Sequence, residues 1–208
     1  VPLAFEQVAQ RLGASDWLLN AICFAGSVWF TLGSYLLYLE ALNAPPDANA
    51  QDTPSVSRPW RWLGWERGRI DLYLAAVQLT GAIVFNINCG MSLVEGLSWW
   101  QSDLWVWTPS TVASCCFVTA SYLGLLEVTH QRWSWSVWDV SWWTNFFSLL
   151  GSFGFLCSSL FGYFADGPIT VPQWWGNAFA LMMGSWFFLA GTYLLVPEVL
   201  IEDKHAED

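Results

Sequence analysis

Charged side chains are scarce in this chain of 208 residues. They make up 12% of it, whereas an ordinary soluble domain has about 25%. Apolar residues make up 55% of the chain and aromatic residues 18%. This composition is typical of a membrane protein and excludes an ordinary soluble domain.

Several chemistries lack the residues that they need. The only histidines, His130 and His205, lie outside the apolar segments, so histidine-ligated haem or chlorophyll inside a membrane bundle is not expected. All five cysteines lie inside those segments, which predicts packing roles and neither a disulfide nor a metal site. The motifs CxxC, HExxH, GxSxG and GxxxxGK[ST] are absent. We therefore expect a non-catalytic protein with no metal and no predicted cofactor, although bound lipid is expected.

Nucleic acid is not an expected partner. The net charge is −10 at pH 7, and the acidic residues are spread over loops and both tails. The seven basic residues form no stripe on a soluble surface. The partners that remain are the lipid bilayer and, within it, other membrane-protein subunits or a second copy of the chain.

Five apolar segments are long enough to span a membrane, which takes about 20 helical residues. They cover residues 16–40, 71–97, 105–127, 140–164 and 174–201. Only the connection 41–69 is long, so the loops leave no room for a soluble domain of ordinary size. The predicted fold class is all-α: a polytopic membrane protein forming one domain over residues 1–208, with a bundle of five transmembrane helices and short interfacial helices.

The basic residues predict the orientation of the bundle. Six of them follow the first, third or fifth span, and only Arg11 lies on the opposite side. The positive-inside rule then places the N-terminus outside, or in the periplasm, and the C-terminus in the cytoplasm. Residues 1–15 have an amphipathic pattern that suits a helix on the outer surface, and residues 202–208 form an acidic cytoplasmic tail.

The chain contains seventeen tryptophans, and most of them fall near the ends of the predicted spans. Indole prefers this boundary, which is apolar on one side and wet on the other. Only Trp29 and Trp186 fall in the middle of a span. The tryptophans expected to contact the membrane interface or a partner are Trp60, Trp62, Trp65, Trp99, Trp100, Trp133, Trp135, Trp138, Trp174 and Trp175.

One phrase recurs along the chain. FAGSVWFTLGSYLLYLE begins at Phe24, and MMGSWFFLAGTYLLVPE begins at Met182, with the same spacing of Gly-Ser, Phe, Gly-Ser/Thr-Tyr and Glu. The other three spans contain variants of it, which predicts a bundle built from repeated single-helix units.

Small residues recur in this phrase every seven positions, which returns them to nearly the same face of a helix. In lipid, such residues let helix backbones approach closely. The sequence therefore predicts a helix-packing seam, and substitution of Gly33 or Gly191 by Leu should disrupt it. The seam residues are Gly26, Gly33, Gly81, Asn88, Ala113, Ala120, Gly151, Ser158, Gly184 and Gly191.

A second set of residues adds polar groups to the spans. Such groups either hydrogen-bond between helices and pair with arginines, or line a path for a solute or ion. The sequence leaves both interpretations open. The residues are Glu40, Glu95, Glu127, Glu198, Gln78 and Asn86.

The first span resembles a known module. The pattern W-x-x-N-x-x-x-x-x-G-S-x-x-F-x-x-G-S, from Trp17 and Asn20 to Gly33 and Ser34, is similar to the small helical module of YrhK-like membrane proteins. The second and third spans depart from it, since they lack the opening Trp and Asn. The resemblance implies a helical membrane protein without an assigned reaction, so no catalytic residue follows from it.

Three hypotheses for function remain. The first is a structural or accessory subunit, or interaction scaffold, beside a larger membrane complex. The second is a small transporter or channel that uses the polar residues of the second span. The third is a protein that binds a carotenoid or quinone between its aromatic rims.

Overall fold

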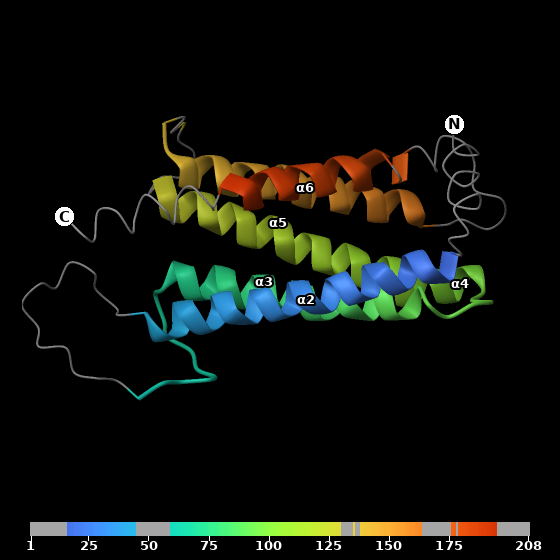
Figure 1. Cartoon of the computed structure of the whole chain (residues 1–208), viewed down its shortest axis with the longest axis horizontal. Helices are drawn as coiled ribbons and strands as arrows, with labels where there is room; N and C mark the ends of the chain where they lie inside the picture. The colour runs from blue at the N-terminus through green and yellow to red at the C-terminus, as the bar shows by residue number, and fades with distance from the viewer. Residues whose placement is uncertain are drawn as a thin grey trace, which may run out of the picture.

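The computed structural model describes residues 16–44, 59–129, 135, 138–163, 176–177 and 179–194 (Figure 1). Within these ranges all regular structure is helical and there is no strand, so the all-α prediction is confirmed. The predictions for residues 1–15 and 202–208 lie outside the described residues and stay predictions. The same holds for Trp133, Trp174, Trp175 and Glu198.

Four helices are long and apolar enough to cross a membrane. They are α2 (Asp16–Asn43), α3 (Ile70–Met91), the continuous helix Trp99–Thr129 and α6 (Val140–Gly162). The third of these consists of α4 (Trp99–Ser102), the π-helical turn η1 (Asp103–Trp107) and α5 (Thr108–Thr129). A shorter apolar helix, Phe179–Leu194, follows, and we refer to it as the C-terminal helix. The chain is thus a polytopic helical membrane protein.

Two helix ends differ from the ends of the predicted spans. The second span was expected to reach residue 97, but α3 ends at Met91. Gly96, with φ of +78°, lies in the turn that follows, in a conformation that glycine adopts more readily than other residues. The third span was expected to begin at residue 105, but its helix begins at Trp99. Pro109 has no N–H for the usual bond to the carbonyl four residues back, and the π-helical turn η1 lies just before it.

Consecutive helices pack as antiparallel neighbours. α2 packs on α3, α3 on α5 and α5 on α6, and the C-terminal helix packs on α6. Figure 1 shows α5 crossing between the α2–α3 pair and the pair formed by α6 and the C-terminal helix. All helices follow the long axis of the molecule. One end therefore holds the C-terminus of α2, and the opposite end holds α4.

The interior consists of several small contact zones. Three separate apolar clusters are centred on Leu42, Phe117 and Trp142. Between them lie fully buried serines, among them Ser114 and Ser152. Small side chains are expected here because close backbone approach, and not hydrophobic exclusion from water, holds helices together in lipid.

Candidate functional site

The predicted seam follows pairs of adjacent small residues, and each pair has a first and a second position. The first positions are the predicted seam residues. The second positions are Ser27 and Ser34 in α2, Ala82 and Cys89 in α3, Ser114 and Ser121 in α5, Ser152 and Ser159 in α6, and Ser185 and Thr192 in the C-terminal helix. The structure distinguishes the two positions clearly.

In α2 the predicted seam residues Gly26 and Gly33 contact no other described helix, so the seam prediction for this helix stays a prediction. Gly26 and Gly33 are exposed, and a Cβ atom added to either would meet nothing within 4 Å. The buried residues are instead Ser34 and Ser27, of which Ser27 donates a hydrogen bond to Asn86 of α3. Adjacent residues point about 100° apart on a helix, so burial of the second position leaves the first on the outer side.

The inner helices bury both positions because each has two neighbours. In α3, a Cβ atom on Gly81 would lie 2.8 Å from Cys116 Cβ of α5, while Ala82 accepts a hydrogen bond from Thr31 of α2. In α5 the pairs that begin at Ala113 and Ala120 are buried at both positions, and so is the pair that begins at Ser158 of α6. The first-position residue Asn88 of α3 is only half-buried. Two adjacent small residues thus serve two interfaces.

Like positions meet at two of these interfaces. α5 and α6 meet through second positions, since the hydroxyl oxygens of Ser121 and Ser152 lie 3.3 Å apart. α6 and the C-terminal helix meet through first positions, since a Cβ atom on Gly151 would lie 2.9 Å from the carbonyl oxygen of Gly184. The C-terminal helix buries Gly184 and Gly191 and exposes Ser185 and Thr192. The exposed face of the C-terminal helix therefore carries the second-position residues.

Sequence reasoning missed two close contacts. A Cβ atom on Gly154 would lie 2.7 Å from the Cα atom of Gly184, and one on Gly124 would overlap the amide of Asn145. The pair Gly151 and Gly154, three residues apart on one helix face, was a signal that could have identified the first of these contacts.

Asn86 lies in a closed hydrogen-bond network between α2 and α3. Its amide oxygen accepts from Ser27 Oγ at 2.6 Å, and its amide nitrogen donates to Thr31 Oγ1 at 2.7 Å. Thr31 in turn donates to the carbonyl oxygens of Ser27 and Ala82. These bonds occupy the polar groups of Asn86 in holding two helices together.

The remaining polar candidates do not come together. Gln78 and Asn88 are half-buried in α3, and their side chains have no hydrogen-bond partner within the described part of the chain. Glu40 and Glu95 are exposed at opposite ends of the bundle, and Glu127 is half-buried at the end of α5. Glu40 and Glu95 therefore cannot act together at one site.

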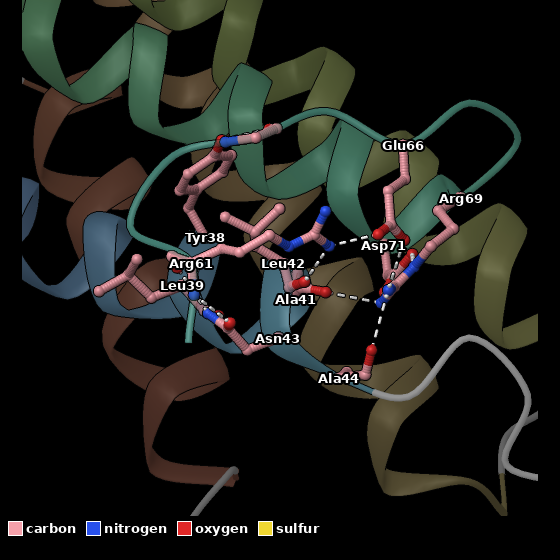
Figure 2. Close-up of polar contacts among 11 residues, drawn as sticks. Tyr38, Leu39, Ala41, Leu42, Asn43, Ala44, Arg61, Glu66, Arg69 and Asp71 are labelled. Atoms are coloured by element: carbon pink, nitrogen blue, oxygen red, sulfur yellow. Dashed lines mark hydrogen bonds and ion pairs between the residues drawn. The ribbon is translucent and has the colours of Figure 1, made fainter. Parts of the chain in front are cut away.

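Arginines cap the C-terminus of α2 (Figure 2). Arg69 donates to the carbonyl oxygens of Ala41 at 2.6 Å and Ala44 at 3.0 Å, and Arg61 donates to that of Leu42 at 3.1 Å. The last carbonyls of a helix have no partner within the helix and carry partial negative charge, which two guanidinium groups satisfy. These arginines were candidate partners of Glu40, but they pair with Glu66 and Asp71.

The acidic partners of the arginines are Glu66 and Asp71. Arg61 pairs with Glu66, and Arg69 bridges Glu66 and Asp71. The hydrogen bond from Arg61 holds the pKa of Glu66 below its ordinary value of 4.5. Burial acts in the opposite direction, and Arg69 lowers the pKa further. The pKa of Arg69 is raised by its bond to Asp71. This network latches the segment 59–69 to the end of α2.

Tryptophans border both ends of the bundle. Trp60, Trp62, Trp65, Trp135 and Trp138 are exposed at the end where α2 finishes. Trp99, Trp100 and Trp105 are exposed at the opposite end, near α4. Two aromatic rims separated by apolar helices are the arrangement expected at the two interfaces of a bilayer.

Two helices also expose tryptophan at mid-span. Trp29 of α2 is 74% exposed, and Trp186 of the C-terminal helix is 62% exposed. Each lies near the middle of its helix, far from either rim. Gly26 and Gly33 flank Trp29 on the same exposed face, so α2 presents an indole between two positions without side chains.

Within the described residues, no group of three or more His, Cys, Asp or Glu side chains could hold a metal ion. The five cysteines are free thiols, of which Cys89 is buried. No bond or cluster of the described residues bears on a bound carotenoid or quinone, so that hypothesis stays a prediction.

Membrane-length helices packed through small residues, with tryptophan at both ends, define the class of this protein as a polytopic helical membrane protein. No family model matches the chain, and the comparisons with curated proteins and with solved structures give no match. The resemblance to the YrhK-like module therefore stays a prediction.

Proposed function

We propose that the protein is a non-catalytic accessory or scaffold subunit that docks laterally, inside the bilayer, against a larger membrane complex. The outer face of α2 is the docking face. The observation that carries this proposal is the exposure of Trp29 at mid-span between the open positions of Gly26 and Gly33.

The indole N–H of Trp29 needs a hydrogen-bond acceptor. At mid-span a lipid-facing indole finds no acceptor in hydrocarbon, and an unpaired donor there is unfavourable. A partner helix could supply both an acceptor and a close apolar contact. Gly26 and Gly33 would let its backbone approach, and buried tryptophans are enriched among residues that dominate binding energy.

The bonding of Asn86 supports a scaffold over a transporter. A residue that lines a path must exchange its hydrogen bonds with a passing solute, whereas Asn86 is bound on both sides by Ser27 and Thr31. The side-chain amides of Gln78 and Asn88 have no hydrogen-bond partner among the described residues, which favours the second candidate, a small transporter or channel. A flux assay in liposomes on Gln78→Leu and Asn88→Leu tests it, and unchanged flux would rule it out.

Affinity purification from native membranes in mild detergent, followed by mass spectrometry, tests the accessory function. Trp29→Leu and Gly33→Leu should lower the recovery of co-purifying membrane subunits without lowering the yield of the protein itself. Trp186→Leu is the matched control, since it removes an equally central tryptophan from the other outer helix. Equal recovery with all three variants would refute docking through α2.

The orientation enters this proposal as well. The positive-inside rule assigns the α2 C-terminal end, with its arginines, to the cytoplasm. Labelling of the exposed Trp138 position, changed to Cys in a cysteine-free chain, by a membrane-impermeant reagent on intact cells tests it. Labelling of this position before lysis would mean that the α2 C-terminal end lies outside the cell, contrary to the proposed orientation.

A further inference from the structure

The segment 59–69, which joins the long connection to α3, folds back along the end of α2. The Tyr38 hydroxyl donates to the carbonyl oxygen of Gly64 at 2.6 Å and accepts from its N–H at 3.1 Å. The Tyr35 hydroxyl donates to the carbonyl oxygen of Trp62 at 3.3 Å. Tyr35 and Tyr38 come before Glu40, which is itself inside α2. The tip of the segment, from Trp62 to Gly64, is bonded to these tyrosines and therefore lies beside the helix and not beyond its end. Figure 1 shows this segment alongside the ends of α2 and α3.

The segment is held at several points along its length. Asn43 accepts from the N–H of Arg61 at 2.8 Å and donates to its carbonyl oxygen at 2.9 Å. Farther on, the ring of Trp65 packs edge-to-face on Tyr73 of α3, with centroids 4.6 Å apart. Together with the arginine contacts in Figure 2, these bonds fix the backbone before any partner arrives.

The side chains that this backbone presents outward are apolar or cationic. Leu63 at the tip is 78% exposed, and Trp60, Trp62 and Trp65 are also exposed. Arg67 of the segment is exposed, whereas the guanidinium groups of Arg61 and Arg69 pair with Glu66. Over its whole length the segment carries three arginines and one carboxylate.

These features match one environment. In a layer poor in water, backbone polar groups need partners within the protein, and the tyrosine hydroxyls supply them at the tip. Indole rings favour the boundary between hydrocarbon and headgroups, and an arginine there meets lipid phosphates. A tip positioned beside the last turns of a membrane helix lies at that depth.

We propose that the segment 59–69 is a preformed membrane anchor, which inserts Leu63 and its flanking tryptophans into the headgroup layer of the leaflet at the α2 C-terminal end. Arg67 contacts the phosphates of anionic phospholipids there. This anchor contacts lipid and needs no partner subunit, so it is independent of docking through α2.

A dye at position 63 tests the insertion. Leu63→Cys, in a chain whose five native cysteines are alanine, is labelled with nitrobenzoxadiazole and reconstituted into nanodiscs with and without phosphatidylglycerol. The same dye at Ile83→Cys, exposed near the middle of α3, gives the lipid reference, and the dye on free cysteine gives the water reference.

We expect the dye at position 63 to emit to the blue of the water reference. Lipids with a nitroxide near the headgroup should quench it more than lipids with a nitroxide near the chain end. Emission equal to the water reference, with quenching by iodide alone, would overturn the proposal. Crosslinking of this position to another polypeptide in native membranes, in place of lipid, would overturn it too.

The charge is tested separately on the intact protein. Native mass spectrometry of the nanodiscs should show that Arg67→Gln lowers the preference for phosphatidylglycerol over phosphatidylcholine by about fivefold, the effect expected for one arginine near a charged surface. Trp138→Phe, at another exposed rim position, serves as the control. An unchanged preference in Arg67→Gln would overturn the assignment of Arg67 to lipid phosphate.

Discussion

Gly154 of α6 and Gly184 of the C-terminal helix are in direct backbone contact. A Cβ atom on Gly154 would lie 2.7 Å from Gly184 Cα and 2.8 Å from the carbonyl oxygen of Ala180. Both neighbours are backbone atoms, which cannot rotate away. The contact therefore requires glycine at position 154.

Substitution of Gly154 by Ala is expected to lower the free energy of unfolding by about 1–3 kcal/mol, the range for overpacked sites. Gly26→Ala is the matched control, since a methyl group there meets nothing within 4 Å. Thermal melting in detergent measures both variants. Equal melting temperatures would mean that the C-terminal helix does not pack on α6 as described.

Gly191 and Gly33 occupy equivalent places in the repeated phrase, and the sequence alone predicts the same result for both. The structure separates them. A Cβ atom on Gly191 would lie 3.2 Å from the carbonyl oxygen of Thr144, whereas Gly33 has open space. We expect Gly191→Leu to reduce melting temperature and yield, and Gly33→Leu to leave both unchanged. A lower melting temperature for Gly33→Leu would mean that Gly33 lies in a helix-packing seam, as the sequence predicts.

Asn86→Leu should destabilise the α2–α3 pair by about 1 kcal/mol, typical of a hydrogen bond between membrane helices, because it removes the partner of Ser27 and of Thr31. Asn88→Leu, two residues on, loses no hydrogen bond within the described part of the chain and provides the control. Titration with a denaturing detergent measures both. A larger loss in Asn88→Leu would contradict the structural role of Asn86.

The latch of Glu66 should open in acid. Its pKa is lower in the folded protein than the ordinary 4.5, so the unfolded state binds the proton more tightly. The stabilisation is therefore complete above about pH 4.5 and is lost as the pH falls through the folded pKa. Hydrogen exchange of the segment 59–69 measures this release. Glu66→Gln should exchange faster at neutral pH and lose the pH response, and an unchanged profile would show that the latch does not hold the segment.

The sequence determined the class of the protein because hydropathy and helix length are local properties. A run of about 20 apolar residues can cross a bilayer only if its backbone hydrogen bonds are made within the segment, as they are in a helix. For this reason α2, α3, α5 and α6 could be predicted from the sequence. The rims of Trp60 and Trp99 could be predicted for the same reason. The ends of α3 and α5 could not, because the turn at Gly96 and the π-helical turn before Pro109 depend on backbone geometry that composition does not reveal.

The tertiary structure alone decided which small residues make contacts. A repeat of seven marks a face of each helix but does not say which neighbour covers it, and Gly33 and Gly191 carry the same signal with opposite burial. The position of a helix in the bundle makes the difference. An inner helix such as α5 has two neighbours and buries both small positions, whereas α2 has one main packing neighbour and leaves Gly26 and Gly33 facing outward.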